Sequence, residues 1–281
     1  MRKPFLFIPV LLILLSASDA SARLLVAVTV PAQAWLVKQI AGDYVDVLTM
    51  IPAGHVAESA QPGPRNLIRF QHADIHLIVG HPDFSFETSY VTPYLEKNES
   101  ATLLSMYNIA AQISPAYLLE GTDPHLWTSP SIMTATAIAV EQNLARMEPE
   151  NADIYRKNLT GLLEKITRLD DQIRNLVKKR NSQILLVYHP AWGHFCHDFD
   201  LQQLAIEDEG KAPGAGSLSA LFAMLEKKNI DFIISAPGSD QRIAAMIAEQ
   251  FNMKLILVNP MDPDWMGMML TMKDMLENDS D

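Results

Sequence analysis

The chain has 281 residues, 48% of them hydrophobic, so it is long enough for one large or two smaller cores without disulfides or structural metals. Its 22 basic and 33 acidic residues give a formal net charge of −11, which disfavours nucleic acid and anionic membrane surfaces because both repel such a field. The single cysteine, Cys196, excludes a disulfide within the chain. Cationic partners are compatible with this composition.

The N-terminus has the pattern of a secretory signal peptide. Arg2 and Lys3 precede an apolar run over 5–15, and a small-residue segment follows that ends in Ala-Ser-Ala at 20–22. The run is too short for a comfortable transmembrane helix, which needs about 20 residues, although an N-terminal membrane anchor is the alternative. No cysteine follows the run, which argues against lipid modification. We predict that 1–22 is cleaved, that two bases and one acid leave with it, and that a periplasmic chain of net charge −12 results.

The first elements of the mature chain predict a β-α-β unit. An apolar run at 24–30 is followed by helical spacing of apolar residues over 32–40, and then by a second extended run. The runs are nearly continuous rather than alternating, which is typical of parallel strands covered by helices on both faces. We therefore predict an N-terminal α/β lobe over 23–150. Its expected strands are 24–30, 45–51, 75–79 and 102–104.

A long amphipathic helix is predicted next. Apolar residues from Ile154 to Leu176 recur mostly at spacings of three and four, which places them on one face of a helix. A helix of nearly thirty residues spans about 40 Å. We therefore expect 151–180 to join two lobes rigidly.

The remaining residues, 181–281, repeat the α/β pattern. Buried strands are expected at 184–188, 231–235 and 254–258, with helices near 218–227 and 241–251 between them. The predicted fold class is therefore α/β, with two parallel-sheet lobes joined by one long helix. Ligands of such sheets bind in the crevice beyond the carboxyl ends of the strands.

Polar side chains lie in four segments where such a ligand would bind. Imidazole, carboxylate and amide groups converging from separate elements suit a divalent cation such as Zn²⁺, with Mn²⁺ and Fe²⁺ as harder competitors. No single spacing among them is a local metal motif, so the residues alone leave a metal site open. The segments are Pro52–Glu58, which includes His55, then Asp123–Trp127, His189–Trp192 and Asn259–Asp262.

Two of these segments resemble motifs of a known family. Residues 123–130 read DPHLWTSP, close to DPHxWxDP, and residues 188–195 read YHPAWGHF, close to FHxAFxYF. Both are motifs of the zinc/manganese-type (cluster A-I) periplasmic solute-binding proteins of metal-ion ABC transporters, which the chain resembles over nearly its whole mature length. This resemblance implies two α/β lobes joined by a rigid helix, with the metal between them.

The resemblance also implies ligands, although two of the four positions differ. His125 and His189 fall on the family's second and third ligands. The family's first ligand is a histidine, and counting from Gly54 places Glu58 there, whose carboxylate can replace an imidazole on zinc. The fourth position, an aspartate in the family, is Asn259. Because an amide is a weaker donor, Asn259 is either a distant ligand or gives way to water, Asp262 or His55.

The predicted function follows from this ligand set. One carboxylate with two imidazoles carries less charge than manganese-type sites, which favours zinc as the transported ion. We expect a monomeric, non-enzymatic protein that delivers its ion to an ABC permease and does not bind nucleic acid. A manganese or iron binder of the same family, or a member with an organic-solute or adhesion role, is the alternative. A zinc hydrolase is disfavoured, because HExxH is absent and Glu58, the evident general base, is assigned to the metal.

Overall fold

The structure is a computed structural model, and it describes residues 23–55, 57, 60–95, 100–118, 123–180, 182–207, 213–228, 230–237 and 241–277. The predicted signal peptide, 1–22, and Glu58 lie outside the described residues. Every helix in the described part of the chain is too short or too polar to cross a membrane.

The N-terminal lobe contains a four-stranded parallel sheet in the order β2-β1-β3-β4. The strands are β1 (Leu25–Val28), β2 (Asp46–Thr49), β3 (Ile75–Ile78) and β4 (Thr102–Ser105), as the apolar runs predict. Val26 pairs with Val47 on one side and Ile75 on the other, and the two central strands, β1 and β3, are almost wholly buried. The helices of this lobe are α1 (Pro31–Ala41), α2 (Pro64–Gln71), α3 (Ser85–Tyr90), α4 (Thr92–Leu95), α5 (Met106–Ile113) and α6 (Pro130–Met147), with 3-10 turns η1 (Pro115–Tyr117), η2 (Leu126–Thr128) and η3 (Pro149–Asn151).

The C-terminal lobe contains a second parallel sheet, in the order β6-β5-β7-β8. The sequence did not predict β6, because Gln202 and Gln203 make it polar at the sheet edge. The predicted buried strand β8 is the opposite edge, and Lys254 and Leu257 at its ends are exposed. The strands are β5 (Ile184–Val187), β6 (Gln202–Ala205), β7 (Phe232–Ser235) and β8 (Lys254–Leu257), and the helices are α8 (Gly193–Asp198), α9 (Ala215–Leu225), α10 (Arg242–Gln250) and α11 (Trp265–Glu277).

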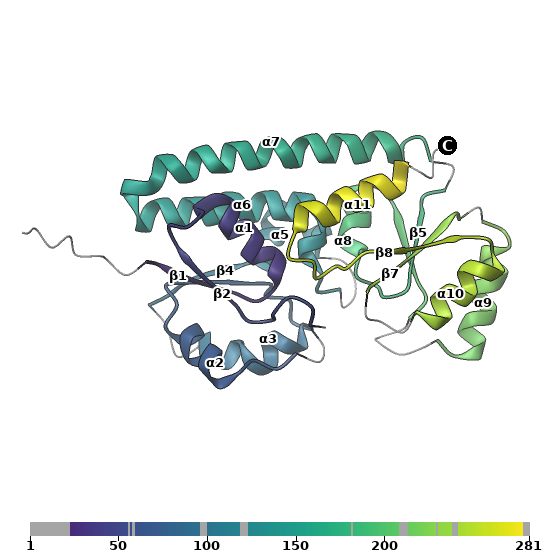
Figure 1. The fold of residues 1–281 in the computed structure, drawn as a ribbon, viewed down its shortest axis with the longest axis horizontal. Helices are drawn as coiled ribbons and strands as arrows, with labels where there is room; N and C mark the ends of the chain where they lie inside the picture. Colours follow the sequence, from purple (N-terminus) through teal and green to yellow (C-terminus); the bar gives the residue numbers. More distant parts are fainter. Residues whose placement is uncertain are drawn as a thin grey trace, which may run out of the picture.

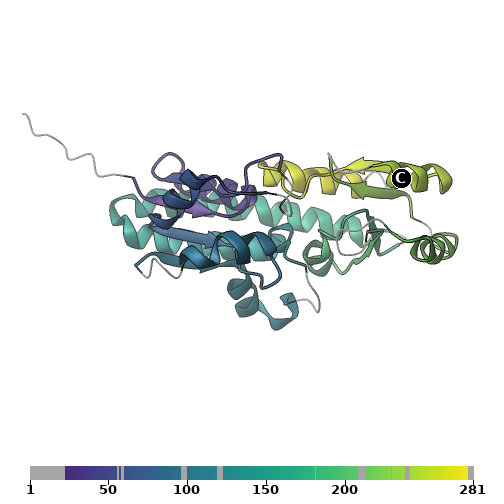
Figure 2. The same cartoon turned by 90° about the horizontal axis from the view of Figure 1, so that it is seen from below.

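The predicted long helix is α7 (Ala152–Val177), which has 26 residues and is therefore about 39 Å long. Figure 1 shows it along one side of the molecule, spanning both lobes, and Figure 2 shows the lobes side by side along the long axis. It packs against α1, α6 and α11. Its apolar stripe supplies the buried residues Tyr155, Leu162, Ile166, Leu169, Ile173 and Val177. The predicted fold class, with two α/β lobes joined by one long helix, is confirmed.

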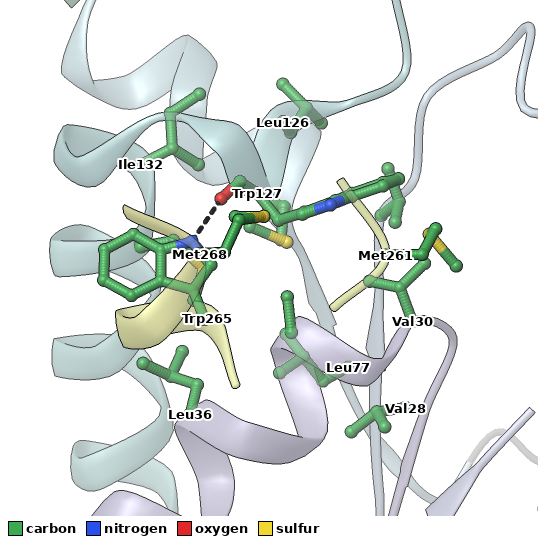
Figure 3. Packing of buried hydrophobic residues seen from close by; sticks show 14 of the residues in the cluster. Val28, Val30, Leu36, Leu77, Leu126, Trp127, Ile132, Met261, Trp265 and Met268 are labelled. Atoms are coloured by element: carbon green, nitrogen blue, oxygen red, sulfur yellow. Dashed lines mark hydrogen bonds between the residues drawn. The ribbon is translucent and has the colours of Figure 1, made fainter. Parts of the chain in front are cut away.

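The last helix, α11, packs against α7 and contributes to the core of the N-terminal lobe. Its buried residues belong to the same hydrophobic core as β1, α1 and β3, which the close view in Figure 3 shows. The Trp265 ring lies 5.3 Å from that of Trp35 on α1. Four of its methionines are core residues: Met268, Met269, Met272 and Met275 are all buried.

A buried carboxylate joins α8 to the start of α6. Asp198 accepts hydrogen bonds from Tyr117 Oη (2.7 Å), Ser129 Oγ (2.7 Å) and the backbone N–H of Ser131 (2.9 Å). Ser129 is the N-cap of α6, so the negative charge lies at the positive end of an 18-residue helix. The backbone oxygen of Asp198 accepts from Arg174 of α7 at 2.7 Å. Asp198 therefore ties α6, α7 and α8 together near the boundary between the lobes.

Candidate metal site

The structure brings together the two histidines that the sequence singled out. His125 lies directly before η2 in the N-terminal lobe, and His189 follows β5 in the C-terminal lobe. Their ring centroids are 5.3 Å apart and the rings are nearly perpendicular, at 82°. His125 is buried, and the side chain of His189 is 29% exposed. The pair therefore spans the boundary between the lobes and is reachable from solvent.

A carboxylate holds each of these imidazoles at Nδ1. Asp123 Oδ1 lies 2.7 Å from His125 Nδ1, and Glu207 Oε2 lies 3.1 Å from His189 Nδ1. An ionised carboxylate only accepts hydrogen bonds, so the ring proton is on Nδ1 and the lone pair is on Nε2. Carboxylates that orient metal-binding histidines in this way are a recurrent feature of zinc sites. Sequence reasoning missed Glu207 because it follows β6, the strand that was not predicted.

Asp123 also crosses between the lobes. Its second carboxylate oxygen accepts the backbone N–H of Gly193 at 3.1 Å, and its backbone oxygen lies 3.0 Å from His194 Nε2. Burial by itself would raise the pKa of the Asp123 carboxyl, but the hydrogen bonds from the His125 ring and backbone, together with electrostatic attraction, outweigh burial and hold that pKa below its ordinary value. Asp123 is therefore ionised at neutral pH and fixes His125 relative to the start of α8.

Two further predicted ligands lie on the loop after β8. Asn259 and Asp262 line a cavity of about 300 Å³ together with Pro237 and Met268. Asn259 Oδ1 accepts the N–H of Met261 at 3.0 Å, which engages one of its lone pairs. The residues on either side of Asn259, Val258 and Pro260, line a much smaller cavity with His189.

His55 is exposed on the loop after β2, and Glu58 lies outside the described residues. Within the described ranges, no group of three or more His, Cys, Asp or Glu side chains is arranged to hold a metal ion. The described protein donors are therefore the imidazoles of His125 and His189.

A second buried carboxylate, which sequence reasoning also missed, organises the end of β3 beside this region. Glu87 of α3 accepts the backbone N–H groups of Val79 (2.7 Å) and Gly80 (2.6 Å), and also the hydroxyl of Thr29. His81 follows immediately, and burial lowers the pKa of its imidazole. Glu87 thus fixes the backbone that presents a neutral His81 close to Asp123 and His125.

The fold and the site together define a class of protein. Two lobes with parallel sheets, joined by a 26-residue helix, enclose a pair of carboxylate-oriented imidazoles at their boundary. Such a site presents two imidazole nitrogen donors to a metal ion. This is the arrangement of a two-lobed solute-binding protein for a metal ion.

The comparisons with known proteins identify the family. The model of the periplasmic component A of the zinc-uptake complex, ZnuA, matches residues 26–278, so the chain belongs to this family. The chain is 23% identical over 270 residues to the high-affinity zinc uptake system protein ZnuA of Bacillus subtilis (strain 168), covering 88% of this chain and 81% of that protein.

Solved structures agree with this assignment. A crystal structure of ZnuA superimposes with a TM-score of 0.80 at 25% identity, covering 92% of this chain and all of the other. A zinc-bound ZnuA deletion mutant gives a TM-score of 0.79 at 24% identity, covering 92% and 98%. The predicted family is confirmed. The family consists of solute-binding proteins, a class without enzymatic function, and zinc is favoured as the bound ion over manganese and iron.

Proposed function

We propose that this chain captures zinc between its lobes with His125, His189 and Glu58, and delivers it to the membrane permease of an ABC transporter. The observation that carries this proposal is the pair of imidazoles, one from each lobe, with their Nδ1 atoms held by Asp123 and Glu207. Their Nε2 lone pairs are the donors that zinc prefers from histidine.

The coordination shell needs more than these two nitrogens. Zinc in proteins is most often four-coordinate, so Glu58 supplies the third protein ligand in this proposal. The fourth is Asn259 or a water molecule, with Asp262 and His55 as the alternatives. Zinc bound by one carboxylate and two neutral imidazoles has a net charge of +1. A water molecule or the Asn259 amide would complete the coordination shell without changing that charge.

The finer parts of the proposal concern processing and assembly. We propose that 1–22 is a cleaved signal peptide without a lipid anchor, and that the mature protein is a periplasmic monomer that binds no nucleic acid. Its units are the N-terminal lobe (23–150), the linking helix (151–180) and the C-terminal lobe (181–281). The acidic composition supports a cationic cargo, since it attracts cations to the surface.

Metal analysis of the purified mature chain tests this function. We expect one tight equivalent of zinc by inductively coupled plasma analysis, and a preference for zinc over manganese in competitive titration with a chromophoric chelator. His125→Ala, His189→Ala and Glu58→Ala should each weaken zinc binding by about 100-fold or more, which corresponds to about 2.7 kcal/mol. His72→Ala removes an exposed histidine at the end of α2 and serves as the matched control.

Two outcomes would overturn the proposal. One is the absence of a tight zinc equivalent in the wild-type chain, and the other is unchanged affinity in both histidine variants. Hydrolytic turnover by the zinc-loaded protein would instead favour the enzyme alternative.

Asp123→Asn and Glu207→Gln should weaken zinc binding by about 10- to 100-fold, because each removes the carboxylate that orients a histidine ligand.

A further inference from the structure

Two buried tryptophans exchange hydrogen bonds between the segment that follows His125 and the segment that links β8 to α11. Trp127 lies in η2, two residues after His125, and its indole N–H donates to the backbone oxygen of Pro260 at 2.7 Å. Trp265 begins α11, and its indole N–H donates to the backbone oxygen of Trp127 at 2.7 Å. Figure 3 shows the second of these bonds, with both rings enclosed by apolar side chains. The segment around Trp127 therefore donates one hydrogen bond to the segment from Pro260 to Trp265 and accepts one from it.

Burial makes this exchange persistent. Both indoles are completely buried, and a buried N–H that loses its acceptor pays its full desolvation cost. Aromatic packing holds both rings in the core of the N-terminal lobe as well: the ring of Trp127 lies 5.1 Å from that of His125 and 6.3 Å from that of Phe84, and the ring of Trp265 lies 5.3 Å from that of Trp35. The two segments cannot separate without breaking both bonds and exposing both rings.

These two hydrogen bonds lie next to two predicted metal ligands, His125 and Asn259. His125 contacts the Trp127 ring, and Pro260 directly follows Asn259. The exchange therefore connects the backbone that carries the N-lobe histidine with the loop that carries the candidate fourth ligand. A single connecting helix such as α7 restrains the separation of two lobes but leaves rotation about its own axis, and a second contact away from that axis restrains this rotation.

We infer that Trp127 and Trp265 are positioning residues that hold the 259–261 segment and His125 at a fixed separation before the metal arrives. This inference rests on the proposed function. Zinc then meets a largely preformed set of donors and does not have to draw the lobes together. A preformed site loses less free energy to ordering on binding, so its affinity for zinc is higher.

Variants that remove only the donor test the inference. Trp127→Phe and Trp265→Phe keep an aromatic ring and delete the N–H, and 3-benzothienylalanine at position 265 keeps the whole bicyclic shape with sulfur in place of N–H. Trp35→Phe is the matched control, because it removes an indole from the same cluster without touching either bond. Zinc affinity, the visible absorption spectrum of the cobalt-loaded protein and the melting temperature are measured for each.

We expect about tenfold weaker zinc binding and an altered cobalt spectrum in the Trp127 and Trp265 variants. The control should lower only the melting temperature. Unchanged zinc affinity and an unchanged cobalt spectrum in both donor variants, with melting temperatures lowered as in the control, would show that the bonds are merely structural and would overturn the inference.

A distance measurement separates this inference from the proposed function. Spin labels at Arg69→Cys on α2 and Met246→Cys on α10, both exposed positions, report the separation of the lobes in the metal-free chain once the buried Cys196 is replaced by alanine. The donor variants should broaden the distance distribution. If the wild-type chain binds no zinc, the proposed function fails, and this distribution still decides the inference: broadening supports it, and a distribution as narrow as that of the parent overturns it.

Discussion

Acidification from pH 7 to pH 4 is expected to destabilise the folded chain through His76, in the middle of β3. The residue is 1% exposed, its ring lies 4.3 Å from that of Phe70, and neither of its nitrogens has a hydrogen-bond partner among the described residues. Burial disfavours the charged imidazolium and lowers the pKa of His76 from 6.5 to about 4.

The sign of the effect follows from proton binding. Between pH 6.5 and 4 the unfolded chain takes up a proton at His76 while the folded chain does not, so stability falls as the pH falls. A difference of about 2.5 pKa units corresponds to roughly 3 kcal/mol at 1.36 kcal/mol per unit. The contribution is present above pH 6.5 and is lost by pH 4. It is a large share of the 5–15 kcal/mol typical of a folded domain.

Urea unfolding of the metal-free chain, followed by circular dichroism at several pH values between 7.5 and 4, measures this effect. His76→Leu replaces the imidazole with an apolar side chain of similar size that cannot titrate. Its free energy of unfolding relative to wild type should therefore rise by roughly 3 kcal/mol as the pH falls across the window. His72→Leu, at an exposed position, should follow the wild-type pH dependence. A constant difference between wild type and His76→Leu at all pH values would refute the reasoning.

Three further predictions concern stability and reactivity. Asp198→Ala should lower the free energy of unfolding by about 3–5 kcal/mol, because it leaves the donors on Tyr117, Ser129 and Ser131 without their acceptor. Asp198→Asn should lower it by less, and urea unfolding measures both variants. Gly80→Ala should lower the free energy of unfolding by about 3 kcal/mol in the same assay, because φ is +75° and the new Cβ would lie 2.1 Å from Ser105 Oγ. Gly161→Ala should instead raise it by about 0.5–1 kcal/mol, because a Cβ at this position inside α7 meets nothing within 4 Å. Equal effects of the two glycine variants would contradict this. Burial raises the pKa of the Cys196 thiol, so it should react with Ellman's reagent only after unfolding; fast labelling of the folded chain would contradict the buried position.

The sequence contained enough to predict both lobes and the long helix. Continuous apolar runs give β1, β3, β5 and β7, because a strand covered on both faces needs no polar side. The apolar spacing from Ile154 to Leu176 predicts α7, because it keeps one face of the helix apolar. The edge strand β6 was missed because an edge is half solvated and its polar residues hide the pattern.

The candidate site was predictable only in part. His125 and His189 carry local motifs, so their importance was visible in the chain itself. The contact of Glu207 with His189 and the hydrogen bonds between the Trp127 and Trp265 segments were not visible in the chain. Each joins residues 18 or more positions apart, and no local sequence pattern indicates such a contact.

The sequence by itself therefore determined the family, the order of the elements and the two histidines, because these depend on local spacing and on motifs read along the chain. Only the tertiary structure decided that the centroids of the two imidazole rings lie 5.3 Å apart with their Nδ1 atoms held by carboxylates, and that α11 returns to the core of the N-terminal lobe. The physical reason is that hydrogen-bond geometry and shared burial arise when distant segments pack together, and packing depends on the whole chain at once.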